Sequence, residues 1–135
     1  MDAPAAYEEL RLRLSEVYDL GKAAALAGWY QRTQMPPGGA SVRAELLGTV
    51  TRLAHERFVS DDIGALLEKL RSFEESVEYD SDEASLIRVA RRDYEKLRRV
   101  QSALRAEISR AGALGQSAWE QARRDSDFAL FLPYL

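Results

Sequence analysis

The sequence predicts an all-α protein, a helical bundle of about five or six helices in a single domain covering residues 1–135. Apolar residues recur at helical spacing through most of the chain, and no alternating apolar and polar run is long enough for a strand. The segments between the helical stretches gather proline, glycine or acidic residues, which favour turns. With 46% hydrophobic and 30% charged residues, the composition is that of an ordinary globular domain.

A long N-terminal helix is expected to begin at Asp2, whose side chain can cap it, with Pro4 in the first turn. Apolar side chains then follow at helical spacing from Tyr7 to Leu26. Two prolines and two glycines follow one another in residues 35–39, and neither a helix nor a sheet can continue through them. The sequence therefore predicts a turn there.

Two shorter amphipathic helices are predicted next. Ser41 is expected to cap a helix that ends near Phe58, and Ser60 to cap another that ends near Phe73. Both carry apolar residues on one face, so both are expected to pack against the same core.

A long helix is predicted from about residue 81. It follows an acidic connection at residues 74–83, in which Asp80 and Glu83 have the spacing of a capping box. Apolar residues keep a period near 3.6 from Leu86 to Ile108. The acids at its start and the bases along it suit the helix dipole.

The end of the sequence is more apolar than the rest. Gly112 and Gly115 are expected to loosen or break the long helix, and a short segment around Trp119 follows. Residues 128–135 are apolar at every position and are expected to form a helix begun by Asp125 or Ser126. Such a segment needs a covering surface.

Composition excludes several classes of function. The chain has no cysteine, so it cannot form a disulfide, a thiolate metal site or a thiol nucleophile. A net charge of −3 argues against nucleic acid as the main partner, because phosphate binding needs excess Lys and Arg. No apolar run of membrane-spanning length and no signal peptide is recognised, so we expect no membrane partner and a cytoplasmic location.

The candidate chemical sites are weak. His55 and Glu56 begin like a His-Glu-x-x-His zinc helix, but Val59 stands where the second His is needed. The acidic cluster at residues 74–83 lacks the pattern of a calcium loop. A basic stretch between Arg88 and Arg110 leaves RNA binding open as a weaker hypothesis, against ion pairs such as Glu95 with Arg98 and Arg99 within the helix. We expect no catalytic residue, no bound metal and no cofactor.

Several stretches, taken in order, resemble the N-terminal region of the carboxypeptidase Taq family, which are zinc-dependent enzymes that remove C-terminal residues from peptides. The family pattern is Trp-Asp-x-x-Thr-x-Met-Pro, and Tyr30 stands here where the family has Asp. Other matching pieces are residues 53–55, 62–64 with Leu67, 87–94, 119–123 and 128–135. The stretch that matches the family pattern, together with two residues that follow it, supplies the family-motif residues Trp29, Gln31, Thr33, Met35, Pro36, Gly39 and Arg43.

The resemblance implies an all-helical architecture that flanks the substrate groove in the enzymes. It also implies that zinc binding and water activation belong to a His-Glu-x-x-His region that this sequence does not contain, so no catalytic residue is carried over. Full-length enzymes of the family are several times longer.

Two hypotheses of function remain. The first is a stand-alone, non-catalytic relative that acts by protein interaction, either as a homodimer or with a full-length carboxypeptidase. The predicted interface residues are Phe128, Phe131, Leu132 and Tyr134. The second is a truncated fragment of an active zinc carboxypeptidase.

Overall fold

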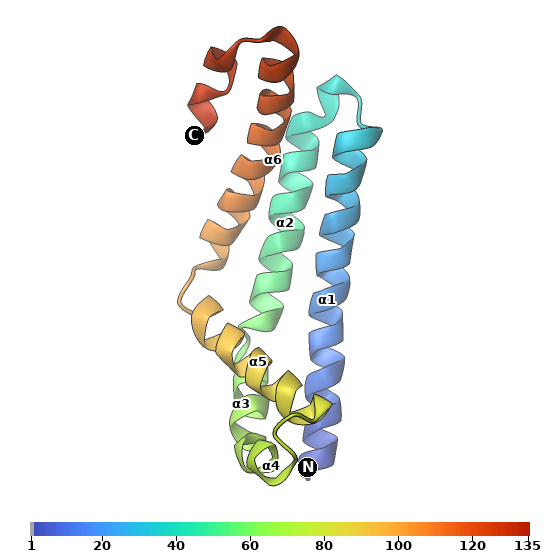
Figure 1. Ribbon diagram of the computed structural model, residues 1–135, viewed down its shortest axis with the longest axis vertical. Coiled ribbons are helices and arrows are strands. Elements are labelled where there is room, and N and C mark those ends of the chain that lie inside the picture. Colours follow the sequence, from blue (N-terminus) through green and yellow to red (C-terminus); the bar gives the residue numbers. More distant parts are fainter. Residues whose placement is uncertain (1) are drawn as a thin grey trace. The chain divides into compact units, whose positions relative to one another are not determined.

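The computed structural model describes residues 2–135 and confirms the all-α class (Figure 1). The helices are α1 (Ala3–Thr33), α2 (Ala40–Phe58), α3 (Asp61–Lys69), α4 (Arg71–Ser76), α5 (Asp82–Leu97) and α6 (Ser102–Asp125). Three short 3₁₀ turns complete the order: η1 (Pro37–Gly39), η2 (Phe128–Leu130) and η3 (Leu132–Tyr134). None of the helices in this part of the chain is long and apolar enough to cross a membrane.

The chain forms two compact units. Unit 1 comprises the chain up to Asp19 together with Ala54–Gln101, and unit 2 comprises Leu20–Leu53 and Ser102–Leu135. The helices α1 and α2 each contribute residues to both units. The expectation of a single domain stays a prediction, and each unit is described here by itself.

Unit 1 contains the hydrophobic core. Leu10, Ile63, Leu70 and Ile87 are its largest fully buried side chains. Aromatic rings from four helices pack around them in two pairs: the ring centroids of Tyr7 and Phe73 are 6.2 Å apart, and those of Phe58 and Tyr94 are 6.4 Å apart. Burial of these aliphatic and aromatic side chains is the main stabilising contribution in this unit.

The helix starts follow the predictions in part. Asp2 Oδ1 accepts the backbone N–H of Ala5 at 3.0 Å, and Ser60 accepts that of Ile63, so both caps are confirmed. The expected cap at Ser41 is wrong, because η1 leads directly into α2 and Ser41 lies inside that helix. Ser81 caps α5 in place of Asp80, since its hydroxyl accepts the N–H of Ala84 at 3.2 Å.

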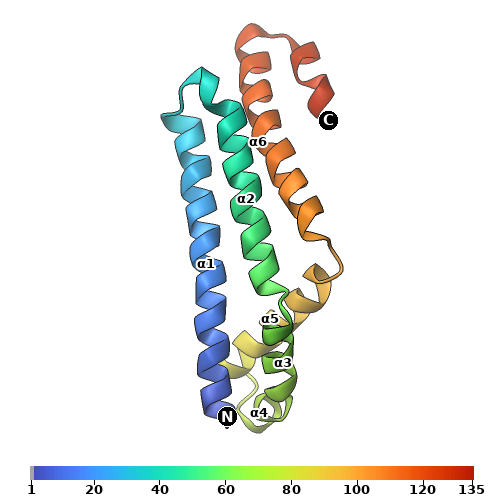
Figure 2. The same ribbon diagram turned by 180° about the vertical axis from the view of Figure 1, so that it is seen from behind.

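The helix ends differ more. The predicted third helix is divided at Leu70 into α3 and α4, and the long helical pattern from residue 81 is divided between α5 and α6. In contrast, α6 continues through Gly112 and Gly115, where we expected a break. The apolar C-terminal segment forms two 3₁₀ turns and not the expected α-helix (Figures 1 and 2).

Candidate interaction surface

The interior of unit 2 is made of small residues. Within it, α2 and α6 approach so closely that a Cβ added at Gly48 would lie 3.2 Å from the carbonyl oxygen of Ala106. Thr51 Oγ1 also donates to Ser109 Oγ at 3.0 Å between the same two helices. The buried residues of this unit are Ala27, Gln31, Ala44, Gly48, Ala106, Ala113, Gly115 and Ala122. Large side chains have no room between helices at this separation.

Six large apolar side chains of unit 2 are half-buried: Leu20, Met35, Leu47, Val50, Leu114 and Phe131. The other large apolar side chains of this unit are exposed. They are Leu26, Trp29, Tyr30, Val42, Leu46, Leu53, Leu104, Ile108, Trp119, Phe128, Leu130, Leu132, Tyr134 and Leu135. Monomeric proteins seldom expose apolar patches larger than a few hundred Å² without a binding role. These residues are distributed over α1, α2, α6 and the C-terminal turns, and together they are the candidate interaction surface of unit 2.

The C-terminal turns contribute the most apolar part of this surface. Ser126 has a left-handed backbone (φ 52°), which ends α6 and turns the chain back along it. The rings of Phe128 and Phe131 then meet edge to face at 6.1 Å, and the Cβ of Tyr134 lies over Gly115. The turns thus cover one face of α6 with one side and expose the other side.

The four predicted interface residues lie within these turns. Phe128, Leu132 and Tyr134 are 61%, 54% and 48% exposed, whereas Phe131 is half-buried against α6. They lie within seven consecutive residues of the sequence, and the structure adds the contact between the Phe128 and Phe131 rings. Their role in an interface stays a prediction.

The family-motif residues lie where α1 ends and α2 begins. Thr33 Oγ1 donates to the carbonyl of Trp29 at 2.9 Å, and a Cβ at Gly39 would lie 2.9 Å from the Met35 side chain. Pro36 precedes η1, which joins the two helices. These residues shape the connection between α1 and α2.

Tyr30, which stands where the family pattern has Asp, contacts Arg43. The Arg43 guanidinium lies 4.9 Å from the centroid of the Tyr30 ring, within the range of a cation–π interaction. Here an aromatic face therefore meets the arginine at the position where the family pattern would supply a carboxylate.

Gln31 is the one polar side chain buried inside unit 2. Its Nε2 donates to the carbonyl of Ala113 at 2.8 Å and to Ser117 Oγ at 3.1 Å, which ties α1 to α6. Beside it lies a cavity of about 370 Å³, whose wall includes Leu114 and Arg124 of α6. Sequence reasoning missed these α6 residues, because more than 80 positions separate them from Gln31 and no motif links them.

A second cavity of about 310 Å³ lies between α6 and the C-terminal turns. Trp119, Phe131 and Tyr134 form its aromatic wall, and Gly112 and Gly115 form its floor. The guanidinium of Arg123 lies 5.7 Å from the Trp119 ring centroid, outside this cavity. An apolar side chain of a partner fits such a wall.

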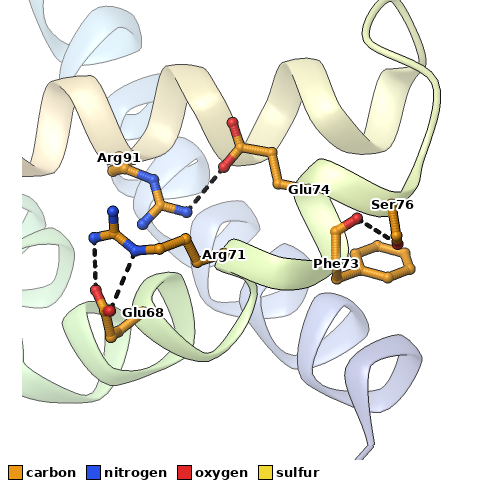
Figure 3. A network of polar contacts seen from close by, with 6 residues as sticks. All are labelled: Glu68, Arg71, Phe73, Glu74, Ser76 and Arg91. Carbon is orange, nitrogen blue, oxygen red and sulfur yellow. Dashed lines mark hydrogen bonds and ion pairs between the residues drawn. The ribbon is translucent and has the colours of Figure 1, made fainter.

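Arginine and glutamate side chains of unit 1 form ion pairs, in which each positive charge lies beside a negative one (Figure 3). Arg91 Nη2 pairs with Glu74 at 2.9 Å, and Arg71 Nη2 pairs with Glu68 at 2.8 Å. The hydrogen bond from Arg71 lowers the pKa of Glu68, and the same bond raises the pKa of Arg71. Acids thus partly neutralise the basic helix, as expected for a structural network. The predicted pairs of Glu95 with Arg98 and Arg99 are not formed among residues 2–135.

His55 does not fit a zinc site. Its Nε2 lies 3.0 Å from the carbonyl oxygen of Leu97, which can only accept a hydrogen bond, so Nε2 donates to it and is not available as a metal ligand. Across residues 2–135, no three His, Asp or Glu side chains are placed to share a metal ion. The residues present therefore do not fit the metal of the resembling enzymes, and no chemical step is assigned to one.

The comparisons with known proteins agree with each other. A model of the carboxypeptidase Taq (M32) metallopeptidase family matches residues 9–135. Thermostable carboxypeptidase 1 of Thermus thermophilus is 36% identical over 135 residues, which is 100% of this chain and 26% of the relative. Carboxypeptidase 1 of Bacillus subtilis is 30% identical over 122 residues, which is 90% of this chain and 24% of the relative.

A solved structure agrees with the sequence matches. The "BsuCP Crystal Structure" has a TM-score of 0.90 and 27% identity, over 96% of this chain and 26% of that chain. The chain thus spans about a quarter of the length of the relatives it matches.

Proposed function

Because the chain belongs to the carboxypeptidase Taq (M32) metallopeptidase family, we propose that it is a non-catalytic relative that acts by protein association. The proposed surface is the apolar face of unit 2, and the proposed partner is a second copy of the chain. Regulation of a full-length carboxypeptidase is a further role that the same surface could serve.

The exposed side chains of the C-terminal turns carry this proposal. Together with Trp119, the exposed residues of segment 128–135 present on the order of 600 Å² of apolar surface. A standard interface buries about 800 Å² on each partner. The exposed area is therefore close to what a stable dimer needs.

The chemistry of these turns suits self-association. Phe128, Phe131, Leu132 and Tyr134 carry no formal charge. Two copies can therefore pack them against each other without removing an ion from water, which is the main cost at polar interfaces. Aromatic residues are also those that most often dominate binding energy.

A second candidate function follows from the lengths of the relatives. The chain matches only about a quarter of each relative, at a TM-score of 0.90 for the solved structure. In this alternative, residues 1–135 are the N-terminal-type part of a longer metallocarboxypeptidase, and the apolar face of unit 2 packs against the rest of that polypeptide.

The oligomeric state tests the first candidate. We expect light scattering to give the mass of a dimer for the chain at micromolar concentration, and that of a monomer for Leu132→Asp. Val89→Asp is the matched control, because Val89 is an exposed apolar residue of unit 1. Circular dichroism checks that both variants remain helical, and a monomeric unmodified chain would overturn the dimer.

Two further measurements separate the candidates. Co-migration of the chain with full-length Thermus thermophilus carboxypeptidase would support the regulatory role. Release of a C-terminal residue from a peptide by the zinc-supplemented chain would contradict the non-catalytic assignment. A reading frame that continues into a His-Glu-x-x-His motif would favour the longer enzyme.

A further inference from the structure

The stretch of residues 20–44 is basic, although the protein as a whole is acidic. It contains no Asp or Glu, whereas the whole chain has a net charge of −3. Its three cations are Lys22, Arg32 and Arg43. The next acid is Glu45, which pairs with Arg110 of α6 at 2.8 Å. This stretch, which lies entirely within unit 2, therefore attracts negatively charged groups.

The guanidinium of Arg43 is held in place, yet its outer nitrogens keep donors for a ligand. It lies 4.9 Å from the centroid of the Tyr30 ring, and its Nε is shielded from water. Among residues 2–135, no carboxylate pairs with Arg43 and no acceptor binds its Nη groups, which are not shielded as Nε is. Such a guanidinium can bind a carboxylate by charge-assisted hydrogen bonds, with little side-chain freedom left to lose.

Apolar side chains are exposed beside this guanidinium. Leu26 lies one turn before Tyr30 on α1, and Leu46 lies about one turn after Arg43 on α2. Because α1 and α2 run in opposite directions, the two leucines occupy the next level of the same helix pair (Figure 1). Leu26 is 66% exposed and Leu46 is 41% exposed. Lys22 lies one further turn along the same face of α1, so the apolar residues have a cation on either side.

We propose that Arg43, Lys22 and the apolar residues between them bind a segment of another protein in which acidic side chains flank apolar ones. The two cations take the carboxylates, and the exposed surfaces of Tyr30, Leu26 and Leu46 take the apolar residues. A nucleic acid supplies phosphates but little apolar surface, so it fits this site less well. Tyrosine and arginine are also among the residues that most often dominate binding between proteins.

This site is a different part of the candidate interaction surface from the C-terminal turns. The dimer proposed above is carried by residues 128–135, and none of those residues belongs to this site, which lies on α1 and α2. The two proposals can therefore fail separately.

A peptide with the sequence Glu-Leu-Leu-Ala-Glu-Leu-Leu, acetylated and amidated so that it has no free terminus, tests the proposal. We would titrate it into the ¹⁵N-labelled chain and follow the Arg43 Nε–H and the backbone amides of Leu26 and Leu46 by NMR. We expect saturable shifts of these signals. The same peptide with glutamine in place of glutamate should bind about tenfold more weakly or less, because it lacks the charges.

Arg43→Gln should also weaken binding of the acidic peptide about tenfold or more, measured by fluorescence anisotropy of the labelled peptide. Arg123→Gln is the matched control, because Arg123 also lies over an aromatic ring, that of Trp119 at 5.7 Å, but belongs to α6. Circular dichroism checks that both variants remain helical. Leu132→Asp should bind the peptide as the unmodified chain does, whatever its oligomeric state.

Several outcomes would overturn the proposal. Absence of saturable shifts or equal binding of the glutamine peptide would remove the role of charge, and tighter binding of an oligouridine of similar length would favour a nucleic acid. Loss of peptide binding in Leu132→Asp would place the peptide on the C-terminal turns. A lower mass of Arg43→Gln than of the unmodified chain in light scattering would show that a second copy occupies this surface.

Discussion

Gly64 in α3 allows a sharp test of how unit 1 is packed. A Cβ added at this position would lie 2.4 Å from Tyr94 Oη and 2.9 Å from Tyr94 Cζ. The Tyr94 ring is buried, and it is held by Phe58 on one side and by the Arg98 guanidinium, 5.5 Å from its centroid, on another. Gly64→Ala therefore forces a packed ring to move.

The magnitude follows from two opposing effects. Replacing a glycine inside a helix by alanine stabilises the helix by about 1 kcal/mol. Overpacking of a filled core costs about 1–3 kcal/mol. We therefore expect Gly64→Ala to lower the free energy of unfolding by about 1 kcal/mol. Gly112→Ala, where nothing lies within 4 Å of the new Cβ, should raise it by about 0.5–1 kcal/mol.

Denaturant unfolding followed by circular dichroism measures both changes. Adding Tyr94→Phe to Gly64→Ala should recover part of the loss, because it removes the atom that the new Cβ approaches most closely. If Gly64→Ala proves as stable as Gly112→Ala, the Tyr94 ring moves freely and the packing argument is refuted.

Three further predictions concern the core and the charged groups. Leu10→Ala should lower the free energy of unfolding in denaturant by about 2–5 kcal/mol, because Leu10 is fully buried in the core of unit 1. The pKa of Glu68 should lie below its ordinary value of 4.5, so the stabilisation from its pair with Arg71 is present at neutral pH and is lost as the pH falls through the lowered pKa. Arg71→Gln should return this pKa towards 4.5 in an NMR titration. Tyr30→Leu should lower the free energy of unfolding by about 0.5–1 kcal/mol, and a double-mutant cycle with Arg43→Met would show whether the cation–π contact is the cause.

Local chemistry was enough to predict where some helices begin. Asp2 and Ser60 each accept a backbone N–H three residues ahead, as their side chains favour at any helix start. The sequence also predicted the Pro–Gly connection after α1, because proline and glycine directly restrict or loosen the backbone and so end a helix. At the start of α5 the sequence predicted a cap at Asp80, but the neighbouring Ser81 caps the helix, because either side chain can accept a helix N–H.

The breaks within helical patterns were decided by packing. No glycine or proline stands between Leu97 and Ser102, yet α5 ends there, whereas α6 continues through Gly112 and Gly115. A glycine costs a helix only about 1 kcal/mol, which contacts along its length can outweigh. The outcome at each of these positions therefore depended on neighbours that are distant in the sequence.

The amino-acid order by itself determined that this is an all-α chain with the family motif at the end of α1, and it identified the apolar segment from Phe128 onward. Only the tertiary structure decided which apolar residues face inward in unit 2. Periodicity predicts that an apolar face is buried, but α2 and α6 meet through Gly48 and Ala106, too closely for larger side chains. The distance between helices is a property of the packed structure, so the exposed surface and the cavity at Gln31 could be found only there.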